Sequence, residues 1–288
     1  MVLSSGGRRR KQPPTMSTHL VVPDTQSKPG TPSEHLDWIG KYILDRKPDV
    51  VIHLGDHWDM PSLSSYDKGK KAMEGRRYAE DVAAGNTDLD LLTAPTRKHN
   101  ARRVKRGSDY TPRWVLLRGN HENRIERAIE DNAQLAGAIG LDDLESPGWE
   151  VHDFLRPVFV DGIGYSHYWA NPMTGRPYGG LISTRLKTIG HSFTAGHQQT
   201  LDSAVRFIHG PNGPVQQRGL VCGSFYLHTE DYLGHQGNSH WRGLIVKHEV
   251  DGDGGYDLME VSMDYLCRRY EGVGLTEFMA SEYPDLRV

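Results

Sequence analysis

Short apolar runs alternate with polar, helix-like stretches in the first half of the chain. The runs at 19–22, 50–54 and 114–117 are apolar enough to be buried β-strands. Amphipathic patterns at 33–48 and 122–138 predict helices that follow the first and third of these strands. This β–α–β–α–β order predicts an α/β domain with ligands at the carboxyl ends of its strands.

The second half of the chain changes to a succession of short strand patterns. Glycine and proline separate these runs, as is typical of strands joined by tight turns. The change from helix-linked strands to a strand-rich order predicts two sheets within one domain, spanning 19–288, rather than two domains. The expected strands lie at 158–160, 163–166, 192–195, 205–208, 220–222, 244–246 and 258–261.

The composition is that of a globular chain with no overall attraction to nucleic acid or membrane. Hydrophobic residues make up 36% of the 288 positions, charged residues 25%, and the net charge is −3. No apolar run approaches the length of a membrane span, and no secretory signal follows the basic start, so we expect a cytoplasmic protein. Cys222 and Cys267 lie in apolar stretches, which favours reduced core residues over a disulfide.

Two segments depart from this pattern. Residues 1–18 are rich in Gly, Ser, Pro and Arg, and we expect a disordered basic tail there, with translation starting at Met1 or Met16. Residues 67–113 form a charged insertion whose basic side chains concentrate at 97–106. The insertion is either a solvated helical hairpin or a basic arm that binds the backbone of DNA or RNA.

Side chains that suit metal binding stand where the predicted strands end. Taken singly, each has an ordinary structural explanation: a turn for Asp24, a helix cap for Asp56, a left-handed turn for Asn120, and a buried core imidazole for His167. Their repetition at successive strand ends instead predicts a site that holds divalent cations against a phosphate. The positions are Asp24, Gly55-Asp56-x-x-Asp59, Gly119-Asn120-His121-Glu122, His167 and Gly196-His197.

This set resembles the motifs of the calcineurin-like metallophosphoesterases, over about residues 19–200. The amino-acid sequence at 61–69 resembles that of family members carried by tailed bacteriophages, which would place the protein in a host cytoplasm. The resemblance implies a four-layer α-β-β-α sandwich of two mixed sheets and the hydrolysis of a phosphoester.

The resemblance also implies two metal sites that share Asp56 as a bridging ligand. Asn120, His167 and His197 would complete one site, with His191 as the nearest competitor for the role of His167. The other site would take Asp24 and Asp56 together with two residues that are histidines in the family and are Gln26 and Gln199 here.

Glutamine offers a neutral amide oxygen where the family has an imidazole nitrogen. The change disfavours zinc relative to Mn²⁺ or Mg²⁺ and should weaken the affected site. The sequence leaves four possibilities: an enzyme with one metal, a two-metal enzyme with an oxygen-rich second site, a degenerate non-catalytic domain, or a replacement ligand such as His228 or His240.

The resemblance assigns the proton transfer to residues that are not metal ligands. It implies a metal-activated hydroxide as nucleophile, His121 as the general acid at the leaving group, and Asp59 as the carboxylate that orients His121. Arg124, one helical turn after the motif, is a candidate contact to a substrate phosphate, although it is also typical of a surface helix residue.

Two classes of function follow. The first is a phosphodiesterase or phosphatase, including a nuclease. The second is a binding module for metal or nucleic acid on the same scaffold, with catalysis lost. Retention of His121 and Asp59 favours the enzyme, since a binding module does not need that pair. The substrate class stays open. Four aromatic residues around His167 either stack a base or belong to the core: Tyr165, Tyr168, Trp169 and Tyr178.

Overall fold

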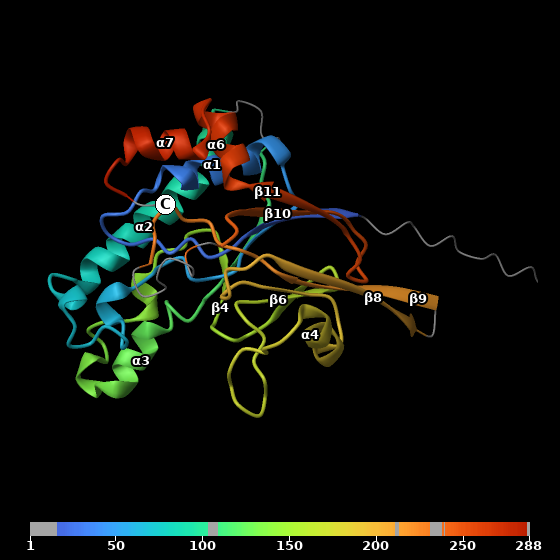
Figure 1. The fold of residues 1–288 in the computed structure, drawn as a ribbon, viewed down its shortest axis with the longest axis horizontal. Helices are drawn as coiled ribbons and strands as arrows, with labels where there is room; N and C mark the ends of the chain where they lie inside the picture. The colour runs from blue at the N-terminus through green and yellow to red at the C-terminus, as the bar shows by residue number, and fades with distance from the viewer. Residues whose placement is uncertain (1–15, 103–108, 211–212, 231–237, 239, 287–288) are drawn as a thin grey trace, which may run out of the picture.

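The protein is a mixed α/β structure of two mixed β-sheets with helices packed around them (Figure 1). The computed structural model describes residues 16–102, 109–210, 213–230, 238 and 240–286. The two-sheet prediction is therefore confirmed at the level of fold class. Most of the predicted basic tail lies outside the described residues.

The first sheet has six strands in the order β11-β10-β1-β2-β3-β4. Strands β1 to β4 run parallel, while β10 and β11 add to the open side of β1 in antiparallel fashion. Strand β1 begins two residues earlier than expected, so the last part of the predicted tail belongs to the sheet. The strands are β1 Ser17–Val22, β2 Val50–His53, β3 Arg113–Leu117, β4 Glu150–His152, β10 Gly243–Val250 and β11 Asp257–Ser262.

The second sheet has five strands in the order β5-β6-β7-β9-β8. Its central neighbours β6, β7 and β9 are parallel, and the edge strands β5 and β8 are antiparallel to theirs. Strands β8 and β9 form a hairpin longer than the sequence pattern predicts (Figure 1). The bounds are β5 Val158–Val160, β6 Ile163–Ser166, β7 Phe193–Ala195, β8 Asp202–Gly210 and β9 Gly213–Val221.

Six α-helices and four short 3-10 helices accompany the sheets in the described part of the chain. The α-helices are α1 Glu34–Arg46, α2 Tyr78–Ala101, α3 Arg124–Asp131, α4 Ile182–Ile189, α6 Met263–Glu271 and α7 Leu275–Glu282. The 3-10 helices are η1 Pro61–Leu63, η2 Lys71–Met73, η3 Ala133–Leu135 and η4 Leu141–Asp143.

Alternating side chains along each strand divide the core into separate clusters. On β1, Leu20 and Val22 pack into the cluster that α1, α2 and α6 cover, whereas Val21 packs into a cluster shared by the two sheets. A third cluster joins Ile182 and Leu186 of α4 to β7 and β9. Both cysteines are buried free thiols, as predicted.

Two predicted helical segments differ from the structure. The pattern at 122–138 gives the shorter helix α3, because the chain turns at Asn132 into the 3-10 helix η3. Within 67–113, the described residues form the 3-10 helix η2 and one long α-helix, α2, rather than the two helices of a hairpin, which was one of the two alternatives. Leu89 and Leu92 give α2 an apolar face in the cluster with α1.

The predicted basic arm is only partly described. Arg97 lies on the exposed face of α2 and pairs with Asp90 at 2.7 Å. Arg103, Lys105 and Arg106 lie outside the described residues, so nucleic-acid binding by 97–106 stays a prediction. None of the helices in the described ranges is both long and apolar enough to cross a membrane.

The close approach of α1 to α2 depends on Gly40. A Cβ at this position would lie 2.2 Å from the Leu92 carbonyl oxygen and 2.8 Å from the Pro95 ring. We expect Gly40→Ala to lower the free energy of unfolding by about 1–3 kcal/mol, because backbone atoms must move to relieve the overlap. Denaturant unfolding measures the change. Gly179→Ala, where an added Cβ meets nothing within 4 Å, is the matched control. A Gly40→Ala protein as stable as the wild type would contradict the packing.

Candidate metal centre

The predicted site residues follow strands of both sheets. Asp24, Asp56 and Asn120 come after the parallel strands β1, β2 and β3, and so lie along one edge of the first sheet. His167 directly follows β6, and His197 comes two residues after β7, in the parallel part of the second sheet. The fold thus gathers residues from five strands, which explains how positions far apart in sequence contribute to one site.

Three of these side chains form a cluster suited to hold a metal ion. One ligand atom each from Asp56, His167 and His197 lies within 4.8 Å of the others. His167 Nε2 is 3.3 Å from Asp56 Oδ2 and 2.9 Å from the amide oxygen of Asn120. The half-site that the sequence left complete is therefore brought together.

His167 is set to present one defined nitrogen. Its Nδ1 lies 2.9 Å from the Leu54 carbonyl oxygen, which can only accept, so Nδ1 carries a proton and Nε2 faces Asp56 and Asn120. Burial lowers the pKa of His167, but the charge of Asp56 outweighs burial and raises the pKa to about 9. The raised pKa favours a second proton, on Nε2, and a cation bound at Nε2 would take the place of that second proton.

His191 does not compete for this role. Its Nδ1 faces the Ser192 carbonyl oxygen, and its ring packs between Trp169 and Phe159, with ring centroids 4.9 Å apart in both contacts. Among the described residues it does not belong to the metal-ligating cluster.

The backbone around Asp56 leaves no room for larger residues. Gly55 and Asp56 both have positive φ, at 96° and 50°, and a Cβ on Gly119 would lie 2.1 Å from Asp56 Oδ1. The same oxygen accepts the backbone N–H of His121 at 2.9 Å. The motif segments Gly55-Asp56 and Gly119-Asn120-His121 are therefore packed directly against each other.

Glu122, quoted in the motif without a role, connects the two loops. Its buried carboxylate accepts backbone N–H groups from Asp56, His57, Trp58 and Gly119, at distances of 2.6 to 3.1 Å. The spacing of the motif alone could not assign this role, because three of the four donors lie more than 60 positions away.

Two of the residues predicted for the second metal carry a buried oxygen that no described residue contacts by a hydrogen bond. Asp24 Oδ2 and Gln26 Oε1 are buried and accept no hydrogen bond from the described residues. Gln199 Oε1 accepts instead from the Tyr226 hydroxyl at 2.7 Å. Burial, reinforced by the charge of Asp56, raises the pKa of Asp24 to about 7. Buried acceptors of this kind are costly unless a ligand or a proton satisfies them.

Neither proposed replacement histidine enters a metal-ligating group in the described part of the chain. His228 Nε2 contacts Glu230 at 2.8 Å, and its ring stacks on Tyr226 at 4.5 Å. His240 lies against the same tyrosine, with ring centroids 5.1 Å apart.

His121 and Asp59 form the predicted pair beside the cluster. His121 Nδ1 lies 2.5 Å from Asp59 Oδ1, and His121 Nε2 lies 3.8 Å from Asp56 Oδ2. Arg124 is no free surface residue, since its guanidinium donates to the Asp59 carbonyl oxygen and lies 3.1 Å from His121 Nε2. Burial lowers the pKa of His121, but the carboxylates of Asp56 and Asp59 outweigh it and raise the pKa overall.

Lys28 is a second cation at Asp59 that sequence reasoning missed. Its ammonium lies 3.0 Å from Asp59 Oδ2 and also pairs with Glu230. Glu230 is 202 positions away along the chain, and no local pattern marks either residue. The contacts keep Asp59 ionised, since Lys28 and His121 overcome the effect of burial and hold the pKa of Asp59 well below its usual value.

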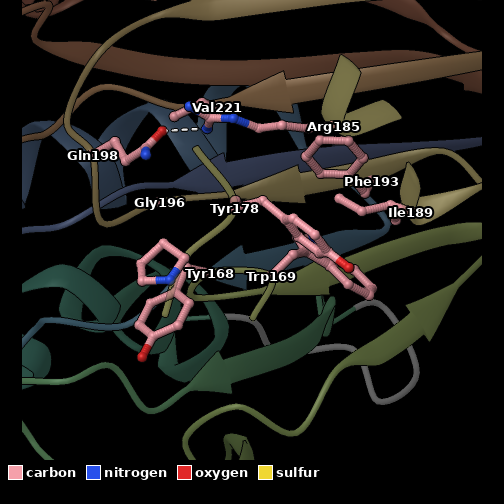
Figure 2. Close-up of a pocket in the computed structure, with 11 residues that line it drawn as sticks. Tyr168, Trp169, Tyr178, Arg185, Ile189, Phe193, Gly196, Gln198 and Val221 are labelled. Atoms are coloured by element: carbon pink, nitrogen blue, oxygen red, sulfur yellow. Dashed lines mark hydrogen bonds between the residues drawn. The ribbon is translucent and has the colours of Figure 1, made fainter. Parts of the chain in front are cut away.

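Of the four aromatic residues considered for base stacking, Tyr165 is unavailable. It is wholly buried between the sheets, and its hydroxyl lies 2.7 Å from His19 Nδ1 and 3.2 Å from Lys247 Nζ. The other three, Tyr168, Trp169 and Tyr178, line a small cavity beside the centre (Figure 2).

Comparisons with known proteins leave the family unassigned. No protein-family model matches the chain, and no curated protein matches it. A solved crystal structure, 9% identical, covers 86% of this chain and all of its own length, with a TM-score of 0.36. A likeness that weak carries no argument, so the functional reasoning depends on the residues of the chain itself.

The cluster predicts a specific response to metal. We expect Mn²⁺ at a hundred times its Kd to stabilise the wild type by about 2.7 kcal/mol, because the ion binds only the folded chain. Thermal unfolding with and without Mn²⁺ measures the shift. His167→Ala should lose most of it, whereas His191→Ala, which removes a half-buried imidazole outside the cluster, should keep it. An equal shift in both variants would contradict the assignment of His167.

Proposed function

We propose that the protein is a metal-dependent phosphoester hydrolase of the calcineurin-like metallophosphoesterases, with its sheets and helices in the four-layer α-β-β-α arrangement of that family. The observation that carries the proposal is the His121–Asp59 pair, held at 2.5 Å beside the cluster of Asp56, His167 and His197. A binding site needs the cluster alone, whereas hydrolysis also needs a group that can move a proton.

The donor set fits divalent metal ions. One carboxylate, two imidazoles and the Asn120 amide oxygen suit Mn²⁺. The buried oxygens of Asp24 and Gln26, which accept no hydrogen bond from the described residues, suit a second, oxygen-preferring ion such as Mg²⁺ or Mn²⁺. A bound divalent ion would lower the pKa of a coordinated water and neutralise charge on the phosphoryl oxygens.

In this proposal His121 delivers a proton to the leaving group. Asp59 holds the imidazole by Nδ1, which leaves Nε2 as the nitrogen that faces the substrate. The guanidinium of Arg124 lies 3.1 Å from Nε2, a contact that favours the neutral ring. The carboxylates of Asp56 and Asp59 nevertheless raise the pKa of His121 overall, which favours a proton on Nε2.

The proton transfer is tested at His121. We expect His121→Asn to lower turnover about 10²- to 10⁴-fold on esters with alkyl or nucleotide leaving groups, the usual size for loss of a general acid. The loss should shrink with p-nitrophenolate, which leaves without protonation. Steady-state kinetics at matched metal content measures both.

Two controls separate this role from a structural one. His209→Asn changes an exposed histidine on β8 and should leave turnover unchanged. Asp59→Asn should give a smaller loss than His121→Asn, since the imidazole remains but is misoriented. Identical residual rates for wild type and His121→Asn on every ester would instead support the non-catalytic binding module.

The two glutamines are tested by restoring the family residues. We expect the double variant Gln26→His and Gln199→His to bind a second Zn²⁺ more tightly, because imidazole nitrogen is a better zinc ligand than an amide oxygen. Equilibrium dialysis with elemental analysis measures the number of bound ions. Gln134→His, on the exposed helix η3, is the control. Unchanged zinc binding in the double variant would show that these positions do not face a metal.

A further inference from the structure

A cleft lies next to the centre and is not used by any step above. Its volume is about 300 Å³, which is within the range of small-molecule sites. It is lined by Arg118, Asn123, Glu126, Leu141, Asp153 and Phe154. None of these residues is a predicted metal ligand or part of the His121–Asp59 pair.

The cleft is joined to the centre through one aromatic ring and one loop. The Phe154 ring centroid lies 6.2 Å from that of His167 and 5.5 Å from that of Tyr168. Arg118 and Asn123 flank the Gly119–Glu122 motif, and the Asn123 backbone N–H donates to the Gly119 carbonyl oxygen at 3.2 Å. A group bound in the cleft would therefore lie next to a phosphate bound at the centre.

The lining does not suit a second phosphate. Arg118 is the single cation in it, and Asp153 already neutralises it at 3.0 Å. Glu126 adds a carboxylate on the exposed side of α3. An aromatic face next to carboxylate acceptors and amide or guanidinium donors suits a flat, neutral heterocycle with amino groups on its edge.

The cavity beside the aromatic residues considered for stacking has no such space. It measures about 10 Å³ between Tyr168, Trp169 and Tyr178. Figure 2 shows Arg185 reaching across it to the side chain of Gln198, with which it forms a hydrogen bond. A nucleobase cannot enter unless these side chains move apart.

We propose that the cleft at Phe154 binds the nucleobase of a nucleotide-containing phosphoester. That the nucleobase is part of the substrate rests on the proposed hydrolase function. Binding of the nucleobase to the cleft does not depend on that function. Phe154 supplies the stacking face, and Glu126 and Asp153 accept hydrogen bonds from exocyclic amino groups. Adenine and cytosine are therefore preferred over uracil.

The test measures binding of adenosine, cytidine and uridine to the full chain in the presence of a chelator, by ligand-observed NMR or calorimetry. Adenosine should bind more tightly than uridine. Phe154→Leu should weaken adenosine binding at least about fivefold, the lower end of a lost stacking contact. Phe154→Tyr should bind like the wild type. Phe159→Leu, at an exposed ring on β5, is the matched control and should also bind like the wild type.

A second variant tests the amino-group preference without touching the core. Glu126→Gln should reduce the ratio of adenosine to uridine affinity, because the amide accepts a hydrogen bond less strongly than the carboxylate does. Absence of nucleoside binding by the wild type, or equal affinities for wild type and Phe154→Leu, would overturn the proposal.

The outcome for the cleft is distinguishable from the outcome for catalysis. Nucleoside binding that depends on Phe154, in a protein that hydrolyses no phosphoester, would uphold the cleft and refute the hydrolase. Hydrolysis of p-nitrophenyl esters by a protein that binds no nucleoside would do the reverse.

Discussion

The centre depends on one buried carboxylate, that of Glu122. Each of its oxygens accepts two backbone N–H groups, and together the four donors belong to the two loops that follow β2 and β3. Hydrogen bonds to a charged group are worth about 1.5–3 kcal/mol each, although such values do not add within a network. This carboxylate brings Asp56 and Gly119 close enough that only glycine fits beside the Asp56 side chain.

The electrostatics of the centre follow from that arrangement. Asp56 is wholly enclosed by protein, and the charges of His121 and His167 overcome the effect of burial and hold its pKa far below the usual range. Burial raises the pKa of Asp24 instead, and none of the described residues donates a hydrogen bond to its Oδ2. The two carboxylates therefore differ as ligands before any cation binds. Asp56 is ready to bind a cation, whereas the raised pKa of Asp24 means that a cation there competes with a proton near neutral pH.

Residues whose roles depend on strand ends could be predicted from the sequence. Asp56, His167 and His197 each follow an apolar strand, which marked them as candidates, and the family resemblance implied that they share a metal. The strand pattern alone does not bring them together, because Asp56 belongs to the first sheet and both histidines belong to the second. The strands of the second sheet were also predicted, because alternating apolar and polar residues, and the glycines that separate the strands, are local signals.

Residues whose roles depend on long-range contacts could not be predicted. Lys28 meets Glu230 across 202 positions, and Phe154 reaches His167 from a loop that carries no periodic signal. The length of the helix predicted at 122–138 was overestimated for a related reason. Its apolar spacing continues past Asp131, but Asn132 takes an extended conformation and caps the 3-10 helix η3, which ends the helix earlier than the pattern indicates.

The central claim is that Asp56, His167 and His197, with Asn120, hold a divalent ion. Anomalous diffraction at the manganese edge, from crystals of the full chain grown with Mn²⁺, tests it most directly. The account predicts a peak at about 2.0–2.6 Å from ligand atoms of these four residues. A second, weaker peak is expected beside Asp24 and Gln26. Manganese bound elsewhere, with His167 Nε2 left facing only Asp56 and Asn120, would contradict the account.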